Sequence, residues 1–334
     1  MKFRPIAAGA SAMLCAALAL SACSTTGGSP SPASPGGANT ASGAPAKAIT
    51  IGMVNQSVGS PFPNQIGQGA QKAADEAGVT MVQIDANSDE QKMSAGVQDL
   101  ISQGVDGILL VPFNPSISGL VQDAHTAGIP IAATHNFVGT SPDDLDPNLA
   151  FALLEDERGS ATKAAQMAVQ ALPNGGKVAI ILGAPGYSED TYRVENFKSA
   201  LQTAGNFTIV GEQPGNWTAQ DGQSACANLL AANPDLSLIY SISDDMAVGC
   251  VEAVKAVNSK ALIIGVGGEK VGITQIQAGA MYGTVCYKPY DEGYAAMKQL
   301  IQVITTGQNP DPRTIYYDTP AITKDNVSQC DPQW

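Results

Sequence analysis

Basic residues and histidine are scarce in this sequence, and these shortages exclude several classes of protein. The 334 residues include 17 Lys and Arg against 30 Asp and Glu, which gives a formal net charge of −13. A chain this acidic is not expected to bind nucleic acid through the phosphate backbone. With two histidines and neither an HExxH nor a CxxC motif, the sequence predicts no metal site and no cofactor.

An apolar run long enough to cross a bilayer is also missing from the amino terminus. Lys2 and Arg4 precede an apolar stretch over residues 6–20, whereas a spanning helix needs about 20 such residues. The pattern predicts a signal peptide over residues 1–22. The sequence LSAC, which ends at Cys23, resembles the lipobox of bacterial lipoproteins. That resemblance implies cleavage before Cys23 and a diacylglycerol on its sulfur; the alternative is ordinary cleavage that leaves a free Cys23.

The segment after this cysteine has almost no charge and little apolar surface. Residues 23–47 consist mainly of Ser, Gly, Pro, Ala and Thr, and Lys47 is their one charged residue. Such a composition predicts a disordered tether, with a reach of roughly 25 to 30 Å. We therefore expect an exported protein, bound through its lipid alone to the outer face of the cytoplasmic membrane. Loss of residues 1–22 would leave a net charge of about −15.

Four cysteines remain after Cys15 leaves with the leader and Cys23 takes the lipid. An even number outside the cytoplasm favours disulfides, and the alternative is four buried thiols. Four cysteines allow three pairings. They are Cys226, Cys250, Cys286 and Cys330.

From residue 48 onward, short apolar runs alternate with segments that have helical spacing. The runs 49–54, 79–85, 107–113 and 129–134 read as strands, and residues 65–77, 93–102 and 118–127 read as helices. The first helix is predicted to stop at Gly78. Apolar strands separated by helices predict parallel sheets covered on both faces.

The same alternation then repeats at an offset of about 130 residues. KVAIILG (177–183) matches the first strand, and residues 194–205 echo the first helix. Strand-like runs follow at 207–213, 236–241 and 261–266, with helices at 225–231 and 246–257. The repeat predicts two doubly wound α/β lobes. Ligands of such lobes bind at the carboxyl ends of the strands, so we expect a site in a cleft between them.

Several motifs, taken in order, resemble the ribose-binding type of solute-binding protein from ABC importers, within the periplasmic binding protein type I family. They are SPFPNQIGQGAQKAADEAG, QDLISQGVDGILLVPFNP, HTAGIPIAATHN, TYRVENFKSAL, DDMAVGCVEAVKA and GTVCYKPYDEGYAA. The resemblance covers most of the chain from Ile49 to about Pro310.

That resemblance implies three crossings between the lobes. Lobe one would comprise residues 48–154 and 288–312, and lobe two residues 155–287 and 313–334. The strand at 315–317 would thus return to lobe two, which favours pairing Cys286 with Cys330. Adjacency of two consecutive helices favours pairing Cys226 with Cys250.

The resemblance also implies a set of ligand-binding residues. Phe62 in SPFP stands where the family places an aromatic against the sugar, and a buried core Phe is the alternative. Trp217, in a polar loop, stands at a second aromatic position, and Arg193 matches the binding arginine. One of Asp156 and Glu157 is expected to pair with Arg193. The full set is Ser60, Phe62, His135, Asn136, Asp156, Glu157, Arg193, Trp217, Ser243, Asp244, Gly267 and Tyr287.

Four positions depart from the family pattern. His135-Asn136 replaces Asp-Arg, Ser243-Asp244 replaces Asn-Asp, Gly267 replaces an Asp, and Tyr287 replaces the hinge Gln. Because one carboxylate accepts from two adjacent hydroxyls, these changes argue against plain ribose or glucose. A small polyol, a cyclitol, or a neutral or weakly anionic sugar derivative is left open.

The expected function is capture by hinge closure without chemistry, by a monomer that then docks on an ABC permease. Two other functions are weighed. A surface lipoprotein that reports its ligand to a membrane receptor would use the same cleft. A secreted hydrolase would need a nucleophile, yet GYSED is not a GxSxG elbow. Ser188 with Glu189 and Asp190 is the only crowding of suitable groups, and neither histidine is near it in sequence.

Overall fold

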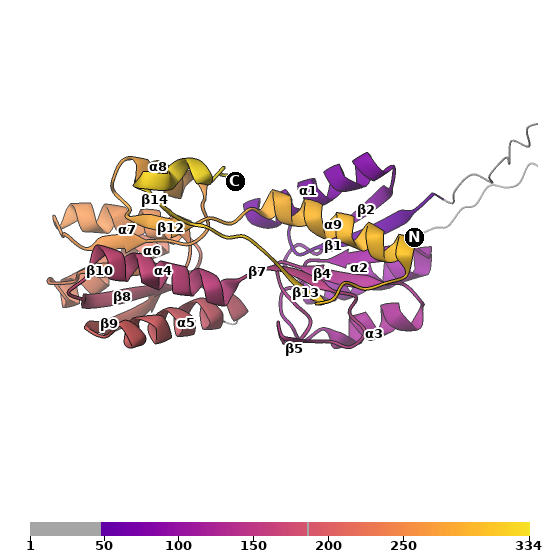
Figure 1. Ribbon diagram of the computed structural model, residues 1–334, viewed down its shortest axis with the longest axis horizontal. Coiled ribbons are helices and arrows are strands. Elements are labelled where there is room, and N and C mark those ends of the chain that lie inside the picture. Colours follow the sequence, from indigo (N-terminus) through magenta and orange to yellow (C-terminus); the bar gives the residue numbers. More distant parts are fainter. Residues whose placement is uncertain (1–47, 186) are drawn as a thin grey trace, which may run out of the picture. The chain divides into compact units, whose positions relative to one another are not determined.

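Two six-stranded sheets layered with helices form the framework of the protein (Figure 1). The computed structural model describes residues 48–185 and 187–334. The expected signal peptide, Cys23 and the expected tether lie outside these residues. The prediction of two α/β lobes, each with a mainly parallel sheet, is confirmed.

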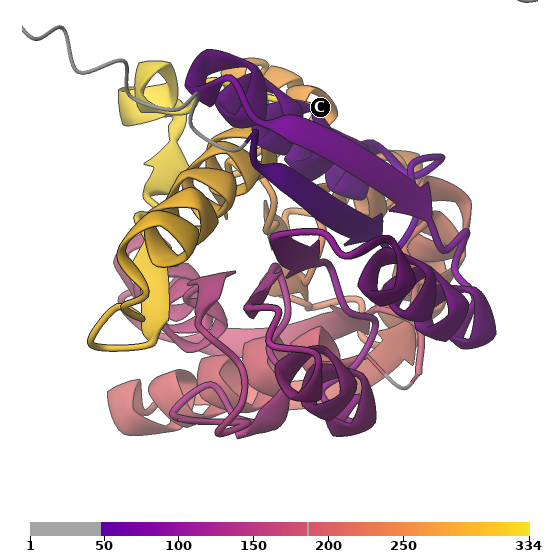
Figure 2. The ribbon, with the colours of Figure 1, turned by 90° about the vertical axis from the view of Figure 1, so that its right-hand side faces the viewer.

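The sheet of lobe one has the strand order β13-β7-β4-β3-β1-β2, and all its neighbouring strands are parallel. Helices α1 and α9 share one core cluster with the sheet and α2 and α3 share another, so the pairs cover opposite faces (Figure 2). The elements are β1 (Thr50–Asn55), α1 (Pro61–Ala77), β2 (Thr80–Asp85), α2 (Glu90–Gln103), β3 (Gly107–Leu110), α3 (Ser118–Thr126), β4 (Ile131–Thr134), β5 (Gly139–Ser141), β6 (Asp144–Leu145), β7 (Ala152–Glu155), α9 (Pro289–Thr306) and β13 (Thr314–Tyr317).

The sheet of lobe two has the order β14-β12-β11-β10-β8-β9, and only β14 is antiparallel to its neighbour. Its strands and helices enclose a single apolar core. The elements are α4 (Glu157–Ala171), β8 (Gly176–Leu182), α5 (Ser188–Ala204), β9 (Phe207–Pro214), α6 (Ala219–Ala232), β10 (Leu238–Ser241), α7 (Asp244–Ala256), β11 (Leu262–Ile264), α8 (Lys270–Gln277), β12 (Gly283–Val285), β14 (Ala321–Thr323) and the 3₁₀ helix η1 (Lys324–Gln329).

The two sheets follow the same order when each is read along the chain. In both, the first strand lies between the second and the third, so β1 with β3 and β8 with β10 mark the points where the strand order reverses. The sequence repeat therefore corresponds to a structural repeat. Loops at the carboxyl ends of these strands are where doubly wound folds bind ligands.

Local signals set the ends of the helices in lobe one. The predicted stop at Gly78 is confirmed, because this residue has φ 66° and its N–H bonds the end of α1. The Asp89 side chain accepts from the N–H groups of Gln91 and Lys92 and so caps α2. Left-handed glycine at a helix end and an acidic side chain at a helix start both satisfy backbone groups that the helix leaves unpaired.

The assignment of residues 315–317 to lobe two is wrong. Strand β13 pairs in parallel with β7, from Thr314 opposite Ala152 to Tyr317 opposite Glu155, and Ile315 packs against the core of lobe one. The third crossing therefore follows Tyr317, and β14 is the strand that returns to lobe two. The other crossings run from β7 to α4 and from β12 to α9 (Figure 1).

The four cysteines lie in lobe two as two close pairs. Cys226 on α6 faces Cys250 on α7 with 5.2 Å between their Cα atoms, and Cys286 faces Cys330 across 5.9 Å. In both pairs the sulfur atoms are at bonding distance. The second pair fixes the tail after η1 to the end of β12. Among residues 48–185 and 187–334, no helix has the length and apolarity that a membrane span requires.

Helices α1 and α9 approach each other through glycines. A Cβ built on Gly293 would lie 1.9 Å from the carbonyl oxygen of Ile66, and one built on Gly69 would lie 1.9 Å from that of Tyr290. We expect Gly293→Ala to lower the free energy of unfolding by about 1 to 3 kcal/mol, since the helices must separate. Urea denaturation measures this change.

A matched control for this prediction is Gly119→Ala on α3. A Cβ there has open space around it, so the substitution should be neutral or stabilise by up to about 1 kcal/mol. Equal unfolding free energies for Gly293→Ala and the wild type would contradict the close helix approach.

Candidate functional site

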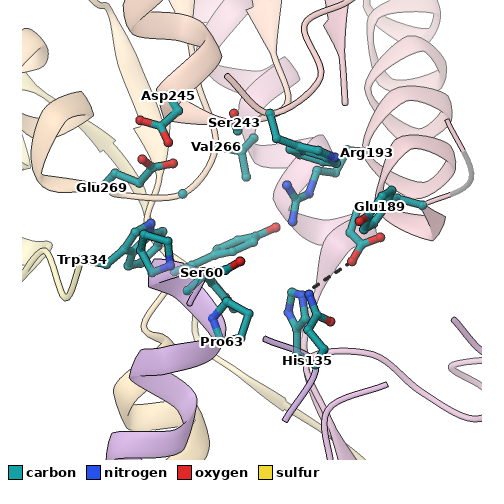
Figure 3. A pocket seen from close by; sticks show the side chains of 17 residues that line it. Ser60, Pro63, His135, Glu189, Arg193, Ser243, Asp245, Val266, Glu269 and Trp334 are labelled. Carbon is teal, nitrogen blue, oxygen red and sulfur yellow. Dashed lines mark ion pairs between the residues drawn. The ribbon is translucent and has the colours of Figure 1, made fainter. Parts of the chain in front are cut away.

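A cavity of about 330 Å³ lies between the two lobes (Figure 3). Lobe one lines it mainly through the start of α1 and the loop after β4. Lobe two lines it through α5 and the loops after β9, β10 and β11. The lining residues are Gln56, Ser60, Pro61, Phe62, Pro63, His135, Tyr187, Glu189, Arg193, Trp217, Ser243, Asp245, Val266, Gly267, Glu269, Tyr287 and Trp334.

Arg193 is the centre of a buried network at the first two crossings. Its Nε and Nη2 donate to the two carboxylate oxygens of Glu157 at 2.5 and 2.6 Å, and its Nη1 donates to the carbonyl of Ile242 at 2.7 Å. The Tyr287 hydroxyl donates to the same carboxylate at 2.7 Å, and the guanidinium lies over the Tyr287 ring. The expected partner of Arg193 is therefore Glu157 and not Asp156.

This network leaves Arg193 charged but electrically compensated. Although burial opposes the charge, the Glu157 carboxylate raises the pKa of Arg193 well above its ordinary value. Three of the five guanidinium N–H groups are used by protein partners, so two remain for a ligand. Since Glu157 already neutralises the guanidinium, those donors suit hydroxyl oxygens at least as well as an anion.

His135 forms a second compensated pair on the wall of lobe one. It has φ 69°, a left-handed conformation that is rare for a residue other than glycine. Its Nδ1 lies 2.9 Å from Glu155 Oε1, and its Nε2 lies 3.7 Å from Glu189 of lobe two. Burial works against the imidazolium, but Glu155, Glu292 and Glu189 raise the pKa of His135 to about 10. The imidazole is therefore charged at neutral pH and links the lobes.

Glu155 and Glu292 extend this cluster into the interior. The ligand atoms of His135, Glu155 and Glu292 lie within 4.8 Å of one another, a grouping that could hold a metal ion and that the sequence patterns did not reveal. The Oε2 atoms of Glu155 and Glu292 are buried without a hydrogen-bond partner. Burial and the Glu155 charge raise the pKa of Glu292 well above its usual range.

Aromatic side chains form much of the remaining wall. The Phe62 ring packs edge-on against Trp334, with 5.0 Å between centroids, and lies 4.7 Å from the His135 ring. Trp217 has φ 61° and a buried Nε1 without a hydrogen-bond partner. Gly183 lies directly under that indole, because a Cβ there would meet the ring at 2.1 Å. Trp334 was missed, since no sequence pattern links the tail to this cleft.

Four predicted residues are not among those that line the cavity: Glu157, which pairs with Arg193, and Asn136, Asp156 and Asp244. Asp156 caps α4 by accepting from the N–H of Gly159, so its carboxylate serves the helix. The Asn136 amide donates weakly to Phe113 and Ser188, beside the cavity rather than in it. Asp244 is fully buried and accepts from the N–H groups of Gly268 and Glu269 and from the Thr284 hydroxyl. Asp245, the next residue, lines the cavity instead.

Gly267 lies at the position where the family pattern has an aspartate, and its surroundings explain the change. A Cβ on Gly267 would lie 3.2 Å from Glu269 Oε1 and 3.5 Å from the Trp334 ring. Gly267 also has φ 141°, where a side chain is strained. The space of the expected carboxylate is therefore taken by Glu269 and Trp334. Glu269 was missed because it lies two residues beyond the motif position.

The crowding around Ser188 is not arranged for nucleophilic chemistry. The structure does bring a histidine near it, since His135 lies 3.7 Å from Glu189. However, Ser188 Oγ donates to Glu189 Oε2 at 3.2 Å, so the carboxylate stands between the hydroxyl and the imidazole. A charged imidazole that does not contact the hydroxyl cannot act as its general base. The side chains that line this cleft are arranged for binding.

Two α/β lobes with a polar, aromatic cleft between them define the class of two-lobed solute-binding proteins. Residues 51–309 match the model of the periplasmic binding protein domain. The ribose import binding protein of Haemophilus influenzae is 30% identical over 72% of this chain and 80% of its own. The xylitol-binding protein of Mycolicibacterium smegmatis is 25% identical over 87% and 81%.

A solved structure has the same fold as this chain. The Caulobacter myo-inositol binding protein superposes with a TM-score of 0.75 at 22% identity, over 85% of this chain and 96% of that one. The chain belongs to the periplasmic binding protein family, in its type I, ribose-binding-like group. The family resemblance in the sequence is thereby confirmed.

The compensated state of His135 predicts an unusual titration. Its folded pKa of about 10 exceeds the unfolded value near 6.5. The interaction therefore stabilises the fold fully below pH 6.5, and this contribution is lost as the pH rises toward 10. Imidazole NMR between pH 5 and 9 should show one histidine resonance that stays in its charged position.

Two variants complete this experiment. His125→Gln assigns the resonances, because His125 on α3 is the other histidine. Glu155→Gln removes the main partner, so the pKa of His135 should fall and its titration should enter the observed range. A titration midpoint near pH 6.5 for His135 in the wild type would contradict its pairing with Glu155.

Proposed function

We propose that this protein is the exported solute-binding component of an ABC importer, and that it captures a small polyhydroxylated ligand between its lobes. The main support for this proposal is the cleft between the lobes. Arg193 of lobe two keeps two N–H donors for a ligand there, and Phe62 and His135 of lobe one line the same cavity. The relatives named for ribose and for xylitol support a sugar or polyol as the ligand.

Size and surface chemistry support the same ligand class. A volume of about 330 Å³ is at the small end of ligand sites, which range from about 300 to 1,000 Å³. Aromatic faces suit the C–H groups of a sugar or cyclitol, and the unpartnered indole N–H of Trp217 suits a hydroxyl. Because Arg193 and His135 are both compensated by carboxylates, the cleft offers no uncompensated cation to an anionic ligand.

Capture works by hinge closure at the three crossings. A ligand shifts the equilibrium between open and closed lobes only by binding the closed form more tightly, so it must touch both lobes. Phe62 and His135 contact it from lobe one, and Arg193, Trp217 and Ser243 contact it from lobe two. The closed monomer then docks on a membrane permease, and no bond in the ligand is changed.

Export to the outer face of the membrane accounts for the leader, the lipid anchor, the tether and the cysteine pairs. The leader is removed before Cys23, a diacylglycerol on this residue holds the protein at the outer face of the cytoplasmic membrane, and residues 23–47 act as a tether. In that oxidising compartment the pairs Cys226–Cys250 and Cys286–Cys330 close as disulfides. Their Cα separations of 5.2 and 5.9 Å support this pairing.

A thermal-shift screen tests the ligand site. Pentoses, hexoses, polyols and inositols are each added to the purified protein, and a compound at 100 times its Kd should stabilise the fold by about 2.7 kcal/mol. Trp217→Ala and Arg193→Ala should each abolish the shift. Trp217→Ala leaves the buried ion pair intact, and its melting temperature without ligand shows whether the variant is folded. Lys177→Ala is the control, because Lys177 pairs with Asp235 within lobe two, away from the cavity.

The lipid anchor has a separate test in a bacterial host. The full chain should partition into the detergent phase of a Triton X-114 extract and incorporate labelled palmitate. Cys23→Ser should lose both properties, because the sulfur that carries the lipid is gone. Equal partitioning of the two proteins would show that Cys23 is not the anchor.

A further inference from the structure

One end of the cavity carries acidic side chains without a basic partner. Asp245 stands at the start of α7, and Glu269 follows β11 (Figure 3). Figure 3 shows their carboxylates turned toward each other, on the far side of the cavity from His135. Glu269 is only 8% exposed. Among the described residues, no Lys, Arg or His nitrogen lies within 4 Å of the carboxylate of Asp244, Asp245 or Glu269.

The fold holds this acidic end in place. The buried carboxylate of Asp244 accepts from the backbone N–H of Glu269 at 3.1 Å, from that of Gly268 at 2.8 Å, and from Thr284 Oγ1 at 2.7 Å. It thereby ties the start of α7 to the loop that carries Glu269. The position of Glu269 beside Asp245 follows from this framework and not from a mobile surface.

The cationic side chains that line the cavity do not neutralise these acids, because they are already paired with other carboxylates. Arg193 is neutralised by Glu157 and His135 by Glu155. Glu189 faces the already compensated His135. Among the described residues, Asp245 and Glu269, with Asp244 behind them, therefore form an acidic end of the cavity that has no basic side chain within 4 Å to neutralise it. Such a site attracts a cation strongly, because the surrounding protein screens charge less than water does.

The ionisation of the acids reflects the same imbalance. Burial and the neighbouring carboxylates of Asp244 and Asp245 raise the pKa of Glu269 to about 9. Burial raises the pKa of Asp244 to about 7, against the hydrogen bonds it accepts. At neutral pH Glu269 therefore retains a proton at the place where a cation could otherwise bind. Binding of a cation would displace that proton into solution.

An aromatic ring stands beside the acids. A Cβ built on Gly267 would lie 3.2 Å from Glu269 Oε1 and 3.5 Å from the Trp334 ring, so this carboxylate and this ring flank the same glycine. Phe62 packs against Trp334 and holds its ring. A carboxylate and an indole face around one small space are the groups that bind an ammonium ion, through charge and through the ring quadrupole. A neutral hydroxyl can donate to the carboxylate, but it has no positive charge to interact with the ring quadrupole.

We propose that the ligand is an amino sugar or an amino cyclitol, whose protonated amine binds between Asp245, Glu269 and Trp334 while its hydroxyls face Arg193. This assignment rests on the proposed function, since it names the ligand class of the same cleft. It differs from a neutral polyol, which carries no charge to neutralise these acids, and from an anionic derivative, which the acids would repel.

Matched pairs of compounds test the amine. The purified full-length protein is titrated at pH 7 by calorimetry with D-glucosamine and D-glucose, D-galactosamine and D-galactose, 1-amino-1-deoxy-D-sorbitol and D-sorbitol, and an amino-inositol and myo-inositol. In at least one pair the amine should bind about tenfold or more tightly than its neutral partner, or about 1.4 kcal/mol. N-acetyl-D-glucosamine, which keeps the nitrogen without its charge, should behave as a neutral compound.

Substitution of the two acids, together with a count of the protons released, tests whether these acids cause the preference for an amine. Glu269→Gln and Asp245→Asn should each reduce the ratio of amine to neutral affinity by about tenfold. Glu252→Gln is the control, because it removes the same charge from α7 at an exposed position outside the cavity lining. Titration of the wild type in buffers of different ionisation enthalpy should show proton release on amine binding, and Glu269→Gln should abolish it.

The outcomes separate this inference from the proposed function. Neutral compounds that bind as tightly as their amines would overturn the amine assignment and leave a polyol-binding function in place. An amine preference that survives both substitutions would also overturn it, since another group would then hold the charge. If no member of any pair binds, the amine assignment and the polyhydroxylated ligand both fail.

Discussion

The buried ion pair between Arg193 and Glu157 decides how the rest of the cleft can be used. A charge taken out of water is costly unless a partner and hydrogen bonds replace its solvent. Glu157 begins α4 just after the first crossing, and Tyr287, which donates to the same carboxylate, stands in the second. The pair therefore fixes two crossings to α5 and leaves the guanidinium with two oriented donors for a guest.

Because carboxylates neutralise the cationic side chains of the cleft, its selectivity for a ligand depends on the charged groups that have no such partner. His135 repeats the logic of Arg193, since Glu155 takes up its charge from behind the wall. In the family pattern an aspartate would lie at Gly267 and an arginine at Asn136. Here position 136 is an asparagine that does not line the cavity. The acidic side chains at this end of the cavity are instead Glu269, two residues after Gly267, and Asp245. Changes at separate positions thus combine to make one end of the cleft more acidic.

Periodicity predicted most of the fold, because short apolar strands and glycine stops act locally. The two lobes, the repeat and the stop at Gly78 follow from such signals. Strand β13 was misassigned, since the pairing of Thr314–Tyr317 with β7 depends on a contact about 160 residues away. Motif positions led to Arg193 and Trp217, which line the cavity, but also to Asp156 and Asp244, which do not. Those carboxylates are used by backbone N–H groups that only the folded loops bring near.

Trp334 shows why the ligand end of the cleft depends on the tail. Its backbone carbonyl accepts from Lys270 N–H, and Cys330 lies against Cys286, so the tail is fixed to lobe two. Its ring nevertheless packs on Phe62 of lobe one. A guest beside Glu269 therefore meets a surface that exists only while both lobes contribute to it. Under the proposed function, in which a ligand favours closure only through contacts made in the closed form, this aromatic contact would link binding at the acidic end to closure of the lobes.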